Sequence, residues 1–176
     1  MEFKNIRALR GPNIWTRCTA LEVAIDLGEM KFPVREIPGF ESRLRSWLPT
    51  VYHPTTHAAD KHDPSIGALT LAHVLEKVVV ALQHLAGVPA SFGRTSATTQ
   101  PGVFHVVVEY HEEEVGRLAV EAARSLVDAA IHARPFDVPG TVQKLRSVDQ
   151  QIRLGPSTGS IVRAATVRNI PYRRLN

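Results

Sequence analysis

The sequence predicts an α+β fold, in which a small, largely antiparallel sheet is packed by several helices. Three observations lead to this prediction. Three separate stretches alternate apolar and polar residues or are rich in β-branched residues, as strands are. Two long stretches, near 67–86 and 111–133, repeat apolar residues every three or four positions, as helices do. The resulting order, β-β-α-α-β-α-α-α, does not alternate regularly as parallel α/β folds do.

The three strands are expected at 2–9, 19–27 and 103–110. EFKNIRAL at the start alternates loosely, whereas TALEVAIDL alternates clearly and puts Glu22 and Asp26 opposite its aliphatic residues. VFHVVVEY is rich in β-branched residues and is the clearest strand of the chain. A Gly-Pro-Asn turn signal separates the first two strands, which we therefore expect to pair.

Helical spacing also predicts a short helix over 39–48, GFESRLRSWL. The segment 49–67 holds three prolines and three histidines with little periodicity, so it is expected to be a long loop. The helix over 67–86 should end at Gly87, because glycine readily adopts the left-handed conformation that closes helices. Residues 88–102 are expected to form a second loop.

The C-terminal part is expected to be helical. The helix over 111–133 has three glutamates in its first turn, where the helix dipole favours them. A shorter helix is predicted over 139–151 and another over 160–168, with Ser157 as its N-cap. Tyr-Arg-Arg-Leu after Pro171 could open a further strand.

Composition and termini indicate a cytoplasmic protein. Of the 176 residues, 44% are hydrophobic and 22% charged, as in ordinary soluble domains. The single cysteine, Cys18, excludes a disulfide framework and a cysteine-rich zinc site. The N-terminus carries charges from residue 2 and no apolar signal region, and the longest aliphatic run, Val78–Leu82, is too short to span a membrane.

The net charge of +4 is unevenly distributed. Residues 48–140 hold six Lys/Arg and ten Asp/Glu, whereas residues 141–176 hold seven Lys/Arg and one Asp/Glu. A basic tail beside an acidic middle indicates a polyanionic partner or an acidic neighbouring domain; the plain alternative is a solvated basic helix. No nucleic acid is expected, because no recognised motif occurs and Tyr172 is the tail's only aromatic residue.

Known phosphate-binding and nucleophile motifs are absent, namely GxxxxGK[ST], GxGxxG after a strand, and GxSxG. LGPSTGS at 154–160 could hold an anion with its amides, or it could simply start a helix. In FGRT at 92–95, Arg94 could bind a carboxylate with two hydrogen bonds.

The helix over 67–86 is apolar almost all round, which predicts burial, yet one line of polar residues runs along it: His73, Glu76, Lys77 and His84. His73-x-x-Glu76-Lys77 differs by one residue from HxxEH, the inverted zincin motif. A protonated lysine has no lone pair for a metal. A metal would therefore need other ligands, such as Glu109, Glu112, Glu113 or a loop histidine. Otherwise the line is a solvent-facing stripe.

Seven blocks carry a resemblance over essentially the whole chain: IRALRGPNIW (6–15), EIPGF (36–40), LAHVLEKVVVALQHLAG (71–87), FGRT (92–95), PGVFHVVVEY (101–110), EEEVGRLAVEAARSLV (112–127) and LGPSTGSIVRAATVRNIPYRRLN (154–176). With them the chain resembles the N-terminal domain of cyanophycin synthetases. The resemblance implies one domain over 1–176, and the alternative is a division into two lobes, 1–66 and 67–176. It also implies that ATP-grasp and Mur-ligase-like domains follow in the parent enzyme, so this chain resembles an excised N-terminal domain.

The family implies the wider activity. Cyanophycin synthetases are ATP-dependent ligases that build poly-aspartate with arginine on each side-chain carboxylate. ATP and Mg²⁺ belong to the two further domains, so no cofactor and no metal is expected in this chain. The expected partners are the cyanophycin polymer or primer and the ATP-grasp domain, within a homo-oligomer of the full-length enzyme.

For this domain the resemblance implies polymer binding and scaffolding. The polymer carries both carboxylates and guanidiniums, so residues of both signs are candidates. Arginines would face carboxylates and glutamates would face guanidiniums. The candidates are Arg94, Arg163 and Arg168, together with Glu112, Glu113 and Glu114.

Two alternatives stay open. Some family members carry an intact HxxEH, which implies a metal-dependent hydrolase that cuts cyanophycin into primers. In this chain His73 and Glu76 match the motif, but Lys77 stands where the motif has its second histidine, so we expect a degenerate site without catalysis. The other alternative is a purely structural domain that supports assembly.

Overall fold

The structure is a computed structural model of the chain, and it describes residues 1–30, 32–52, 69–152, 156–168 and 170–171. It confirms the predicted α+β fold. The elements are β1 (Glu2–Leu9), β2 (Ala20–Asp26), the 3-10 turns η1 (Val34–Glu36) and η2 (Pro49–Tyr52), α1 (Phe40–Trp47), α2 (Leu71–Leu85), β3 (Gly93–Ala97), β4 (Val103–Glu109), α3 (Glu113–Ile131), α4 (Val138–Ile152) and α5 (Pro156–Val167).

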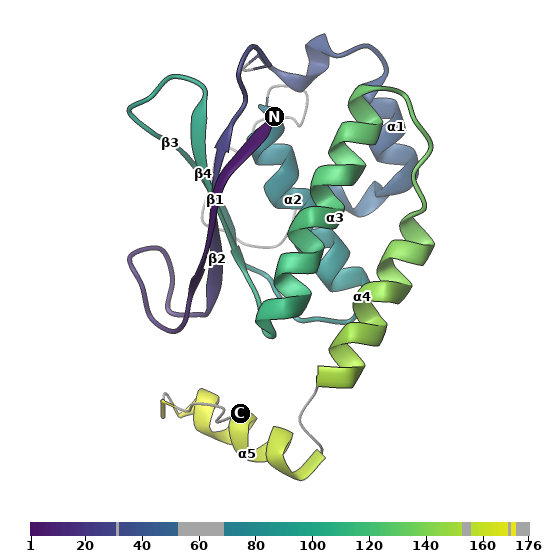
Figure 1. Ribbon diagram of the computed structural model, residues 1–176. Coiled ribbons are helices and arrows are strands. Elements are labelled where there is room, and N and C mark those ends of the chain that lie inside the picture. The colour runs from purple at the N-terminus through teal and green to yellow at the C-terminus, as the bar shows by residue number, and fades with distance from the viewer. Residues whose placement is uncertain (31, 53–68, 153–155, 169, 172–176) are drawn as a thin grey trace.

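The strands form one four-stranded sheet with the order β1-β2-β4-β3. All three pairings are antiparallel, and the predicted pairing of the first two strands is confirmed. The central pair joins β2 to β4. The sheet therefore combines strands from residues 1–66 with strands from residues 67–176. The division of the chain into two lobes at this point stays a prediction. Within the described residues, α1, α2, α3 and α4 lie on one side of the sheet, and α5 lies apart from it (Figure 1).

The prediction of a loop over 88–102 was wrong in its middle. Gly93–Ala97 forms β3, which pairs with β4 at the rim of the sheet. GRTSA lacks the aliphatic alternation that marks a strand, and glycine, serine and alanine favour strands weakly. The segment is extended because β4 offers a free edge to it, which is a tertiary cause that no local pattern records.

Helix boundaries differ from those predicted at two places. The helix expected from 67 begins at Leu71, with Thr70 as its N-cap, and it ends as expected before Gly87, whose φ is +85°. The helix expected from 160 begins at Pro156, which suits a first turn because its missing N–H needs no partner there. The predicted N-cap Ser157 therefore lies within α5. The strand suggested after Pro171 lies outside the described residues.

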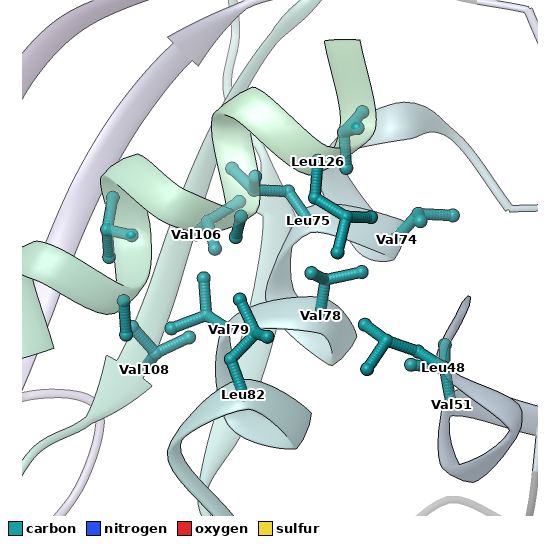
Figure 2. Close-up of a cluster of buried hydrophobic side chains, with 14 of the residues drawn as sticks. Leu48, Val51, Val74, Leu75, Val78, Val79, Leu82, Val106, Val108 and Leu126 are labelled. Carbon is teal, nitrogen blue, oxygen red and sulfur yellow. The ribbon is translucent and has the colours of Figure 1, made fainter. Parts of the chain in front are cut away.

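The hydrophobic core lies between the sheet and the helices. Buried side chains of α2 pack there against buried side chains of β4 and α3 (Figure 2). This set includes Leu75, Val78, Val79, Leu82, Val106, Val108 and Leu126. Among the described residues, no helix has both the length and the apolarity needed to cross a membrane.

Candidate functional site

Three residues of the polar line on α2, namely His73, Glu76 and Lys77, are half-buried, whereas His84 is exposed. His73 is half-buried, with its ring edge-on to Phe104 at 5.9 Å between centroids. Its Nδ1 lies 2.8 Å from the Thr70 hydroxyl oxygen. Burial, helped by the positive charge of Lys77, lowers the pKa of the His73 imidazole. His73 therefore favours its neutral form.

Glu76 packs against β3 rather than extending into water. The Thr95 hydroxyl donates a hydrogen bond of 2.6 Å to Glu76 Oε2. The glycine at 93 makes room for this carboxylate, because a Cβ there would lie 2.7 Å from Glu76 Oε1. Residues of α2 and β3 thus hold Glu76 in place across the helix–sheet interface. A solvent-facing stripe does not describe it.

The donors on this helix do not fit a zinc site of the HxxEH kind, because an ammonium group stands at the second histidine position. In the described part of the chain, no three His, Cys, Asp or Glu residues lie together as metal ligands would. Two of the suggested substitutes are engaged elsewhere. Glu109 accepts the backbone N–H of Ser91 and of Phe92, each at 2.9 Å, and Glu113 binds arginines. The histidines of the 49–67 loop lie outside the described residues.

The three consecutive glutamates differ in their surroundings. Glu112 is half-buried at the N-cap position of α3. Glu113 accepts hydrogen bonds from Arg10 and Arg117, and these outweigh the opposing effect of burial, so the pKa of Glu113 is lowered. Glu114 is exposed. Of the three, Glu114 is the carboxylate that best matches a surface contact with a guanidinium.

One of the three predicted arginines lies on β3, and the other two lie on or directly after α5. Arg94 is exposed on β3, at the end of the sheet where β4 leads toward α3. Arg168 follows α5 and donates a hydrogen bond of 3.1 Å to the Ala164 carbonyl. Arg163 lies on α5, and its side chain is outside the described part. Because α5 lies apart from the sheet, the structure does not bring Arg94 together with the two arginines of the α5 segment (Figure 1).

The face of the sheet away from the helices carries a group of residues that the sequence did not reveal. Arg7, Glu22, Val107 and Arg94 are direct cross-strand neighbours, one on each of β1, β2, β4 and β3. Directly opposed residues project from the same face. Because Thr95 reaches Glu76 on α2, its neighbour Arg94 and this whole row project from the opposite face, which we call the uncovered face because no helix of the described residues lies over it (Figure 1).

Glu22 is the centre of this row. Its side chain is only 9% exposed, and the guanidinium of Arg7 donates to its Oε2 from Nε, at 3.0 Å, and from Nη2. The Trp15 indole N–H donates to Oε1 at 3.3 Å, and His105 Nδ1 lies 3.1 Å from the same oxygen. The carboxylate is therefore covered by three partners from three different parts of the chain.

Trp15 lies over the row. Its ring centroid is 6.2 Å from that of His105, and the Arg94 guanidinium carbon is 5.9 Å from the indole centroid. Val107 is fully buried although it does not belong to the main core, which indicates cover from this side. Asn13 shapes the loop, because its Oδ1 accepts the Trp15 backbone N–H at 2.9 Å, as in an Asx turn.

Sequence reasoning missed this group because its members are far apart in the chain. The alternation of 19–27 did place Glu22 opposite the aliphatic residues, which was the one available signal. A separate hollow of about 330 Å³ lies beside α3, lined by Met1, Met30, Glu121, Arg124, Ser125, Asp128 and Ile131. It includes none of the predicted site residues.

Comparison with known proteins gives a consistent result. The sequence model of the cyanophycin synthase-like N-terminal domain matches residues 22–132. The cyanophycin synthetase of Trichormus variabilis is 35% identical over 187 residues, covering 100% of this chain and 20% of the relative. Those of Crocosphaera subtropica and a Synechocystis species are 33% and 34% identical, each again covering 100% of this chain. The chain spans about one fifth of the length of these curated relatives.

Proposed function

This chain belongs to the family of cyanophycin synthase-like N-terminal domains, and on that premise we propose that it binds the cyanophycin polymer. In this role it holds the growing chain near the ligase domains of a cyanophycin synthetase in the cytoplasm, and catalyses no step itself. The full coverage of this chain by the synthetase relatives is the observation that carries the proposal. The missing phosphate-binding motifs agree with it.

Binding would act through effective concentration. A domain linked to the ligase domains keeps the polymer end nearby, at about millimolar levels for short flexible links. The polymer displays carboxylates and guanidiniums, and the described surface offers groups of both signs. Arg94 and Glu114 are both exposed; Arg94 lies on β3, which pairs with β4, and Glu114 lies in the first turn of α3, the helix that follows β4.

Cosedimentation with insoluble cyanophycin tests this function. The chain is expected to pellet with the polymer at low salt and to be released as salt rises, because the contacts are ionic. Chitin, an uncharged insoluble polymer, provides the matched control. A chain that stays in the supernatant with cyanophycin at low salt contradicts the proposal.

Hydrolysis of the polymer is disfavoured by Lys77. Incubation with zinc and cyanophycin should therefore release no dipeptides from the natural chain. The variant Lys77→His restores the HxxEH pattern on α2. Dipeptide release by the natural chain would replace the binding role with an enzymatic one, whereas release only by the variant would identify a lost activity.

A structural role is favoured by one further observation. Ile161, Val167 and Ile170 are exposed on and after α5, with 69%, 82% and 52% of their surface accessible. Large aliphatic residues gathered on one exposed helix are typical of a docking surface. We propose the ATP-grasp domain of the same parent chain as the partner of α5. Ile161→Ser and Val167→Ser in the full-length enzyme should then weaken assembly and leave polymer binding intact.

A further inference from the structure

The uncovered face of the sheet has its charges arranged in one row. Arg7 on β1 and Arg94 on β3 occupy the two outer strands, with Glu22 and Val107 between them. Three strand spacings separate the two arginine backbones, which is about 14 Å. In the described part of the chain no helix lies over this row (Figure 1).

The row has an excess of positive charge at its surface. The Glu22 carboxylate is 9% exposed and is neutralised by Arg7, whose own side chain remains 60% exposed. The His105 imidazole, with Nδ1 3.1 Å from Glu22 Oε1, lies beside the carboxylate, and its side chain is 38% exposed. Arg94 has no carboxylate partner among the described residues. A ligand approaching this face therefore meets cationic groups first, and the acid lies beneath them.

Trp15 holds the Arg94 guanidinium in a defined place. The indole is itself fixed, because its N–H bonds to Glu22 and its backbone N–H bonds to Asn13. A guanidinium over an indole face gains cation–π attraction while its N–H groups stay available at the edge. The arrangement orients Arg94 without using its hydrogen-bonding capacity, as a preformed anion-binding residue requires.

We infer that Arg94, held over Trp15, is a carboxylate-binding residue on the uncovered face of the sheet, and that its ligand is a carboxylate group of a chain lying along this face. A guanidinium matches a carboxylate with two parallel hydrogen bonds, which makes this the ligand class of the site. The identification of that chain as cyanophycin rests on the proposed function. The preference for carboxylates rests on the excess positive charge of the row and on the orientation of the Arg94 guanidinium over Trp15.

The experiment compares two arginine variants of equal charge. Arg94→Gln removes the proposed contact, and Arg146→Gln removes an exposed arginine of α4 on the other side of the molecule. Binding of cyanophycin by Arg94→Gln should fall about tenfold or more, and that of Arg146→Gln should change by less than about twofold. Circular dichroism checks that both variants fold. Equal affinities of the two variants overturn the site while leaving polymer binding by the domain intact.

A second readout is independent of cyanophycin. The chain has two tryptophans, so Trp47→Phe leaves Trp15 as the sole tryptophan, which can be excited selectively over the tyrosines. Its emission should change on titration with poly-L-aspartate, lose that response in Arg94→Gln, and stay constant with poly-L-arginine. A response to poly-L-arginine alone, or to neither polymer, overturns the carboxylate site. A poly-L-aspartate response that depends on Arg94, without any binding of cyanophycin, retains the site and overturns the proposed function.

Discussion

The two faces of the sheet are built from the same strands and are stabilised differently. Toward the helices, β2 and β4 present aliphatic residues such as Val23, Ile25 and Val106, all nearly or fully buried. Away from the helices, the same strands present Glu22 and His105, joined to Arg7 and Trp15. Burial of aliphatic surface stabilises the face toward the helices, and this contribution does not depend on the direction of individual contacts. The second face depends on each polar group finding its partner.

This difference predicts how each face tolerates change. An aliphatic side chain removed from the first face leaves a cavity, and its cost scales with the lost volume. A polar group altered on the face away from the helices leaves its hydrogen-bond partners unsatisfied. The resulting loss in the free energy of unfolding depends on how well water replaces the lost hydrogen bonds. The covered face should therefore show the larger losses.

Leu82→Ala should produce the largest effect. Leu82 is fully buried among α2, β4 and α3, and its truncation should lower the free energy of unfolding by about 2–5 kcal/mol (Figure 2). Leu85→Ala, three residues on in the same helix but 37% exposed, should cost less than about 1 kcal/mol. Urea denaturation measures both. Similar losses for the two variants would contradict the placement of the core.

Glu22→Gln should have an intermediate effect. The neutral amide loses charge-assisted hydrogen bonds and presents an NH₂ group to the Arg7 or Trp15 donors, so unfolding should be easier by about 1–3 kcal/mol. The matched variant Glu2→Gln affects an exposed pair with Lys4 and should leave stability unchanged. Urea midpoints separate these outcomes. A Glu22→Gln variant as stable as Glu2→Gln would show that the row does not stabilise the fold.

Protonation of His73 should give the smallest effect on the free energy of unfolding, and this effect is seen only when the pH is changed. Its pKa in the folded state is lowered from 6.5, so the unfolded chain binds a proton first as the pH falls. Its contribution to stability should therefore be present above pH 6.5 and decline between 6.5 and the lower folded-state pKa. NMR titration of the imidazole measures that pKa directly. A folded-state pKa at or above 6.5 removes or reverses the effect and contradicts the description of His73 as half-buried and neutral.

Sequence patterns over short segments predicted most of the elements that form the interface between the sheet and the helices. The 3.6-residue repeat of α2 and α3 and the β-branched residues of β4 are local signals of burial, and each corresponds to an observed element. β3 was missed because Gly93–Ala97 has no such signal and becomes a strand only by pairing with β4. Ser157 was misplaced because proline at 156 can start a helix as well as serine can cap one.

The sequence by itself determined the α+β class, the long helices and the family, because hydrophobic period and motif order are written along the chain. It also placed Arg94 and the glutamates among the charged candidates. Only the tertiary structure decided that Arg7, Glu22 and Arg94 share one row beneath Trp15. Pairing between strands sets such neighbours, and antiparallel register in this row joins residues that lie from 13 to 85 positions apart. No local period contains that information.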